Sequence, residues 1–179
     1  MTTYVLLLRG VMPSGKNRLP MSRLREVLGE AGYSRVRTYI QSGNVLVDTT
    51  LAAREVEIGV RSLIRDRIGP DLVVIVRTGS RLDKVLKENP FRDGYDISRV
   101  FFISFLEPVP ESKADELRSR DFSPEHLAFG RNRDTAYMVI PGPYGRGTLS
   151  GGFLEKSAGI PATMRNFNTI QRLAEMSRE

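Results

Sequence analysis

Two short polar segments hold the residues whose types could recognise a ligand. Gln41–Asn44 carries two amides, a hydroxyl and a glycine directly after Tyr39, and Arg165–Thr169 carries an arginine, two asparagines and a threonine around a predicted helix start. Groups of this kind donate hydrogen bonds to anions and to polar ligands. A structural interpretation stays open, because a tight hairpin also requires Asn and Gly and because Asn before a helix also serves as a cap.

Basic residues next to turns extend this pattern. Arg9 ends a predicted strand, and Lys16 lies in the loop that follows it. This loop differs from a Walker phosphate loop, because Asn17 rather than Ser or Thr comes after the lysine. Arg146 lies in the glycine-rich segment 142–152, which leads into a helix start and so predicts either an anion site or a mobile surface loop.

A site for a nucleotide or a nucleic acid would use these residue types in three roles. Arginine and lysine hold phosphate, amides and hydroxyls read polar groups, and a ring such as Tyr39 or Phe167 stacks on a base. We expect the segments around Asn44 and Arg165 to contribute to one shared site. The candidate ligand-binding residues are Arg9, Lys16, Tyr39, Gln41, Ser42, Asn44, Arg77, Arg146, Arg165, Asn166, Asn168 and Thr169.

Catalytic and metal-binding side chains are scarce in this chain. It has no Cys and one His, which excludes disulfides, thiolate metal sites and Cys nucleophiles. A Ser-His-Asp arrangement could use only His126, which we interpret as a surface or edge-strand residue. No close pair of carboxylates suggests a general acid and a general base. The sequence therefore leaves the catalytic residues unknown, and it predicts no metal site and no cofactor.

Arginine carries most of the positive charge. Of the 27 basic residues 22 are Arg and 5 are Lys, and the net charge of the 179 residues is +6. Guanidinium groups suit phosphate and carboxylate recognition, although a solvated basic surface explains the same numbers. The apolar run Val5–Leu8 is too short for a signal sequence, and no run reaches the roughly 20 apolar residues of a membrane span. We expect a cytoplasmic protein with no membrane partner.

Apolar periodicity predicts a ferredoxin-like half in residues 1–79, with the order strand, helix, strand, strand, helix, strand. Val36, Thr38 and Ile40 alternate with polar residues and are expected to face the core. A linker with a short helix at 80–88 occupies residues 80–98. The elements predicted in the first half are, in chain order, 4–8, 20–31, 35–41, 45–47, 56–68 and 72–76.

Residues 99–179 predict a second ferredoxin-like half, followed by an additional helix. No sequence repeat relates the two halves. Strands around Leu6 and Phe102 are apolar on both faces, so either the other half or a second copy of the chain, as in a homodimer, must cover the face without helices. The elements predicted here are, in chain order, 100–106, 112–120, 125–131, 136–140, 148–158, 162–165 and 166–176.

Three stretches of the chain resemble a bacterial family catalogued as domain of unknown function 1697. They are residues 6–47, with the motif TYIQSGN, residues 73–91, with VVIVRTGSRL and then ENPF, and residues 155–176, with MRNFNTIQRLAEM. The resemblance implies two ferredoxin-like halves, and it implies no function because the family has none assigned. It adds Asn17 to the polar positions above. The chain departs from the usual family pattern at Met12–Ser14, Thr148 and Gly151.

These observations predict an α+β protein of two ferredoxin-like halves packed together, with an additional C-terminal helix. We expect it to bind an anionic, phosphate-bearing ligand such as nucleic acid or a nucleotide. One alternative is an enzyme acting on a small phosphorylated or carboxylated metabolite, in which Lys16 or Tyr39 would have to serve as the base. A second alternative is a protein-interaction module whose open sheet faces meet a partner chain.

Overall fold

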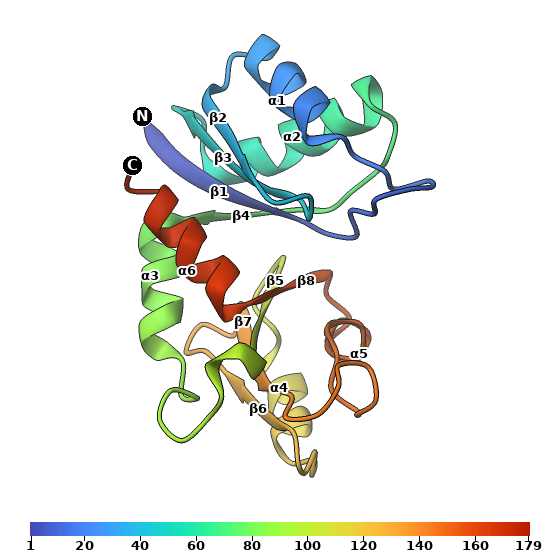
Figure 1. Cartoon of the computed structure of the whole chain (residues 1–179), viewed down its shortest axis with the longest axis vertical. Coiled ribbons are helices and arrows are strands. Elements are labelled where there is room, and N and C mark those ends of the chain that lie inside the picture. Colours follow the sequence, from blue (N-terminus) through green and yellow to red (C-terminus); the bar gives the residue numbers. More distant parts are fainter. The chain divides into compact units, whose positions relative to one another are not determined.

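The computed structural model describes the whole chain, residues 1–179 (Figure 1). Residue contacts divide it into two compact units. The first unit comprises Met1–Leu82 and Leu173–Glu179, and the second comprises Asp83–Arg172. The boundaries of the halves expected at residues 79 and 98 stay predictions.

The first unit contains a four-stranded antiparallel sheet with the strand order β2-β3-β1-β4. This order, reached through the connections β-α-β-β-α-β, is the ferredoxin-like arrangement. Helix α3 (Gly79–Glu88) follows the last strand directly. The elements of the sheet unit are β1 (Thr2–Leu8), α1 (Met21–Glu30), β2 (Ser34–Tyr39), β3 (Asn44–Thr49), α2 (Ala53–Arg67) and β4 (Val74–Thr78).

The second unit repeats this arrangement, with the strand order β6-β7-β5-β8. A single 3-10 turn, Ile97–Arg99, precedes it, and helix α6 (Phe167–Met176) follows the last strand directly. The predicted α+β fold of two ferredoxin-like halves is confirmed. The elements are β5 (Val100–Phe105), α4 (Glu111–Arg118), β6 (His126–Phe129), β7 (Thr135–Val139), α5 (Gly151–Ala158) and β8 (Ala162–Asn166).

Each sheet has a core on the face that its two crossover helices cover (Figure 1). In the first unit Leu6 and Val45 on the sheet pack with Leu24 of α1 and Val60 of α2, and all four side chains are fully buried. In the second unit an equivalent cluster joins strands β5 and β7 to helices α4 and α5. Alternate residues of each strand therefore belong to these cores, as the period of a strand requires.

The opposite face of each sheet is buried as well. Val5, Leu7 and Leu46 point away from the α1–α2 core, and their exposed fraction is 0%. In β5 the neighbouring residues Phe102 and Ile103, which point to opposite faces, are 1% and 0% exposed. The prediction that the central strands are buried on both faces is confirmed.

The helices are short and amphipathic. The longest, α2, has 15 residues and buries Val56, Val60 and Ile64 at a spacing of four, which places them on one face. None of the helices combines the length and the apolar character that crossing a membrane requires.

Strand β2 departs from the predicted alternation. It ends at Tyr39, because Ile40 adopts the left-handed φ of 49° and begins the turn, and 55% of its side chain is exposed. At the other end the register shifts between Ser34 and Arg37, where Arg35 has a φ of 45°. Of the three expected core residues, Val36 packs against the core and Thr38 pairs in register with the core residue Val45. The expectation that Ile40 faces the core is therefore wrong.

Two predicted elements of the second unit are shorter in the structure. Strand β6 stops at Phe129, because the chain turns at Gly130, whose carbonyl accepts a hydrogen bond from the Arg133 N–H. Helix α5 begins at Gly151 rather than near Thr148, because the hydroxyl of Ser150 accepts the Phe153 N–H and caps the helix.

The β2–β3 turn yields a test of this backbone. Gly43 has a φ of 77°, and a Cβ placed on it would lie 2.6 Å from Val11 Cγ2 and 2.8 Å from Leu8 Cβ. We expect Gly43→Ala to lower the free energy of unfolding by about 2 kcal/mol or more, since a strained φ and a clash act together. Urea denaturation measures the change.

The matched control is Gly29→Ala, in helix α1. No atom lies within 4 Å of the added Cβ, so this variant should gain about 0.5–1 kcal/mol of stability from the higher helix propensity of Ala. An equal effect of the two substitutions would contradict the close packing of the turn.

Candidate functional site

The β2–β3 turn is held by its own polar side chains. Asn44 is fully buried, and its Nδ2 donates to the carbonyl of Tyr39 at 3.1 Å and to Ser42 Oγ at 2.9 Å. The Leu8 N–H donates to the carbonyl of Gly43 at 2.8 Å, which ties the turn to the end of β1. The amide of Asn44 therefore has a structural use, while the ligand-binding role expected for Asn44 and Ser42 stays a prediction.

Gln41 connects this turn to the loop between β1 and α1. Its Nε2 donates to the carbonyl of Leu19 at 3.0 Å, just before α1 begins. The loop itself closes through the Met12 N–H, which donates to the carbonyl of Asn17 at 3.0 Å. Because of these contacts the turn and the loop form one surface, on which Arg9 and Lys16 are exposed.

A cavity of about 530 Å³ opens where this surface meets the start of α1, and we call it the α1 cavity. Its charged residues are Arg18 and Arg25, both exposed, and no carboxylate lines it. Arg25 Nη1 donates to Thr38 Oγ1 at 2.6 Å, which fixes its position beside β2. The cavity is lined by Pro13, Arg18, Pro20, Met21, Ser22, Arg25 and Gln41.

The first turn of α1 adds backbone donors to the α1 cavity. Pro20 is the N-cap residue and has no side-chain acceptor to cap the helix, and the first turn contains no acidic residue. The first N–H groups of a helix have no partner within the helix, and they carry partial positive charge. Two guanidinium groups and a helix start therefore favour an anion in this cavity.

The predicted residue Arg77 lies on the face of the first sheet that points away from α1 and α2, and Arg37 of β2 lies on the same face. Registers across the sheet align Arg37 with Leu46, Val5 and Arg77, so the two arginines share one face at opposite edges. Arg37 Nη1 donates to the carbonyl of Met176 at 2.8 Å. The guanidinium of Arg37 is thus engaged by the C-terminal segment of its own unit. Tyr39, two residues after Arg37 on the same strand, is half-buried, and its stacking role stays a prediction.

The last strand of each unit ends in the same way. Arg77 and Arg165 are the second-last residues of β4 and β8, and a helix follows each strand directly. Arg77 Nη1 donates to the carbonyl of Val76 at 2.9 Å, and Arg165 Nη1 donates to the carbonyl of Met164 at 2.7 Å. The same arginine geometry therefore recurs in both halves, although no sequence repeat marks it.

The residue after each arginine starts the following helix in a matching way. Thr78 Oγ1 accepts from the Arg81 N–H at 3.2 Å, and Asn166 Oδ1 accepts from the Thr169 N–H at 2.9 Å. Both bonds join a residue to the N–H three positions later, which is the geometry of a helix cap. Asn166 and Thr169 therefore build the start of α6, whereas Asn168 is exposed.

Arg165 is the most deeply buried of the predicted cations. It is 9% exposed, it shares a sheet face with Phe102 and Tyr137, and its Nη1 also donates to Thr163 Oγ1 at 2.8 Å. Burial lowers the pKa of Arg165 to about 10, because a charged group loses hydration inside the protein. The guanidinium nevertheless keeps its charge at neutral pH.

Two backbone N–H groups of the glycine-rich segment 142–152 donate to a side chain of the protein itself. Glu125 is 8% exposed, and its Oε2 accepts the N–H groups of Thr148 at 2.9 Å and Leu149 at 2.8 Å. The carboxylate thus sits where the sequence suggested an external anion. Arg146 is exposed nearby and lines a cavity of about 250 Å³ together with Glu125, which we call the Glu125 cavity.

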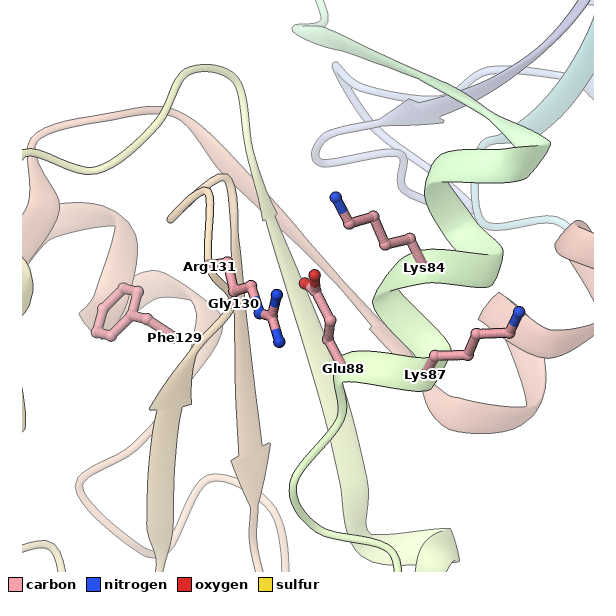
Figure 2. A pocket seen from close by; sticks show the side chains of 6 residues that line it. All are labelled: Lys84, Lys87, Glu88, Phe129, Gly130 and Arg131. Atoms are coloured by element: carbon pink, nitrogen blue, oxygen red, sulfur yellow. The ribbon is translucent and has the colours of Figure 1, made fainter.

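A third cavity, of about 480 Å³, lies between α3 and the β6–β7 turn in the second unit (Figure 2). Figure 2 shows Glu88 and Arg131 pointing toward each other, while the ammonium of Lys87 points away from them. The cavity is therefore of mixed charge. It is lined by Lys84, Lys87, Glu88, Phe129, Gly130 and Arg131.

His126 lies at the first position of β6, which is an edge strand, and it is exposed, in agreement with its interpretation from the sequence. Its ring contacts Tyr95 at a centroid distance of 5.2 Å and Phe91 at 6.0 Å. No group of three or more His, Cys, Asp or Glu is placed to hold a metal ion.

The structure groups the predicted residues by unit. Arg9, Lys16 and Gln41 lie on one surface beside the α1 cavity, and Arg77 ends β4 of the same unit, whereas Arg146 and Arg165 belong to the second unit. That the segments around Asn44 and Arg165 share a site stays a prediction.

Sequence reasoning missed Arg18, Ser22 and Arg25 of the α1 cavity. The signal for them was weak: Arg18 stands at the end of a loop, and Ser22 and Arg25 resemble ordinary solvated positions of an amphipathic helix. Only the fold of the loop over the helix start brings them together around one cavity.

Comparisons with known proteins place the chain in a family. Residues 1–133 match the family model described as protein of unknown function, DUF1697. The conserved bacterial protein SP0830 from Streptococcus pneumoniae is similar in structure, with a TM-score of 0.73 and 22% sequence identity over 100% of this chain and 99% of that chain. No curated protein matches the sequence. The chain belongs to the DUF1697 family, and at this identity the structural likeness shows the fold.

The helix cap at the start of α6 can be tested separately from ligand binding. We expect Asn166→Ala to lower the free energy of unfolding by about 1 kcal/mol, because the Thr169 N–H loses its acceptor. Asn168→Ala is the matched control, since Asn168 is exposed, and its change should stay within about 0.5 kcal/mol. Urea denaturation of both variants decides, and equal losses would contradict the capping role of Asn166.

Proposed function

We propose that the protein binds a phosphate-bearing anion, a nucleotide or a nucleic acid, in the α1 cavity. The observation that carries the proposal is the lining of this cavity: Arg18 and Arg25 supply two guanidinium groups, no carboxylate opposes them, and the uncapped start of α1 borders them. Arginine forks and helix N-termini both complement phosphate oxygens.

The size of the cavity supports a ligand about as large as a mononucleotide. Its volume of about 530 Å³ falls within the range of small-molecule sites, roughly 300–1,000 Å³. The hydroxyl of Ser22 and the amide of Gln41 provide the few polar groups that such sites use to orient a ligand. Gln41 is also held against Leu19, so it forms a fixed part of the wall.

The mixed-charge cavity of Figure 2 fits a phosphate less well. There the carboxylate of Glu88 faces Arg131, and repulsion by this carboxylate would offset the attraction of the basic residues. The α1 cavity has no such opposing charge, and this difference favours it as the primary anion site.

A longer phosphate-bearing ligand would extend from the α1 cavity over the neighbouring loop. Arg9 and Lys16 are exposed on the same surface and lie in the segments that Gln41 and Gly43 hold together. Additional phosphate contacts of this kind raise affinity in a salt-dependent manner, because each one releases condensed counterions. This is the nucleic-acid form of the proposal.

The proposal is tested by fluorescence-anisotropy titration with labelled single-stranded RNA, single-stranded DNA and duplex, and with inorganic pyrophosphate as competitor. We expect Arg18→Ala and Arg25→Ala each to weaken binding about tenfold, since a charge-assisted hydrogen bond contributes about 1.5–3 kcal/mol. With a single-stranded probe, each substitution should also reduce the slope of log K against the logarithm of the salt concentration by about 0.7.

Arg65→Ala is the matched control. Arg65 lies on α2, is exposed and pairs with Asp66, so its loss changes the net charge equally without touching the α1 cavity. The affinity of this variant for each probe should stay within about twofold of the wild type, because an exposed ion pair contributes little free energy. Weak, salt-insensitive binding to every probe, or equal losses in all three variants, would refute the proposal.

A further inference from the structure

We infer that the Glu125 cavity in the second unit binds a small zwitterion that carries an amino group and an anionic group. This site is independent of the α1 cavity and takes ligands of a different kind. Glu125 and Arg146 line it from two segments, and Arg146 belongs to the glycine-rich segment that leads into α5.

Only one oxygen of the Glu125 carboxylate has hydrogen-bond partners in the protein. Its Oε2 is satisfied by two backbone N–H groups, but Oε1 is buried and has no hydrogen-bond partner in the protein. A buried acceptor without a donor lowers the stability of the protein, and it does so more when it is charged. A donor that enters the neighbouring cavity and reaches Oε1 would recover that stability.

The loop at Gly147–Leu149 holds the Glu125 carboxylate in place. A Cβ on Gly147 would lie 2.0 Å from Glu125 Oε1. Only glycine therefore lets the backbone approach the carboxylate this closely. The two amide bonds to Oε2 come from the next residues, Thr148 and Leu149. The position and orientation of the carboxylate are thus set by the loop, as in a preorganised binding group.

The positive charge in this cavity is the guanidinium of Arg146. Arg146 is exposed in the same cavity and forms no ion pair with Glu125, so its guanidinium is available to an anionic ligand group. A ligand with only an anionic group would meet the carboxylate of Glu125, and one with only an amine would meet Arg146. A molecule that carries both groups satisfies both residues.

The remaining lining and the volume limit the size of the ligand. Phe122, Ile140 and Pro143 form the apolar part of the wall, which suits a short methylene chain between the two charged ends. The cavity measures about 250 Å³, slightly below the usual range for drug-sized ligands. Small amino acids match this combination of size and charge.

The experiment is an NMR titration of the full-length protein with glycine, β-alanine and γ-aminobutyrate, a series in which the spacing of the charges increases. Methylamine and acetate are the single-charge probes. We expect saturable shifts of the Gly147, Thr148 and Leu149 amides, and at least one amino acid that binds about tenfold tighter than either single-charge probe.

Two variants assign the charges. Glu125→Gln keeps an oxygen for the Thr148 and Leu149 N–H groups but turns an NH₂ group toward the ammonium, and Arg146→Ala removes the exposed cation. Each should reduce the affinity for the best amino acid to that of a single-charge probe, while the dispersed Thr148 and Leu149 resonances report that the loop stays folded.

The opposite results overturn the inference. One such result is the absence of saturable shifts throughout the series, as expected if a water molecule alone donates to Oε1. The others are binding of acetate as tight as that of every amino acid, and an unchanged affinity of Glu125→Gln for the amino acids.

Discussion

The contact between the β2–β3 turn and the end of β1 determines the geometry of the first unit beside the α1 cavity. The carbonyl of Gly43 accepts the Leu8 N–H, and the absence of a side chain on Gly43 lets the turn lie against Leu8 and Val11. Gln41 then reaches Leu19 and holds the loop in front of α1. Because this contact sets where the helix starts, it also sets where two arginines meet the first backbone N–H groups of α1.

Both units place an arginine near the end of the sheet in the same way. In each, the second-last residue of the last strand turns its guanidinium to the preceding carbonyl, and the next side chain caps the following helix. The repetition is one of backbone geometry and hydrogen bonding rather than of sequence, since Thr78 and Asn166 perform one role with different side chains. Much of the polarity that sequence reasoning ascribed to ligands serves these junctions.

The fold could be predicted from the sequence because its signals are local. The apolar run Val5–Leu8 and the helical spacing of Val56, Val60 and Ile64 each identify one element without knowledge of its neighbours. Ile40 could not be predicted, because a β-branched residue at positive φ contradicts the local preference and is held there by the surrounding turn. Long-range contacts therefore override the pattern at this position.

The candidate site was less predictable, since a site depends on which segments meet in space. Arg18 and Arg25 acquire significance only through a cavity that also includes Gln41. Glu125 is distant in sequence from the loop whose amides it binds, so its contact with the N–H groups of Thr148 and Leu149 could not be predicted. Residue types alone identified the glycine-rich loop but not the charge that it would hold.

Binding of phosphate in the α1 cavity can be observed by mapping amide shifts during titration of the labelled protein with AMP. We expect saturable shifts concentrated at Met21, Ser22 and Arg23, whose N–H groups begin α1, and at the neighbouring Gln41. Saturable shifts confined to residues outside this cavity, or no saturable shift at all, would contradict this expectation.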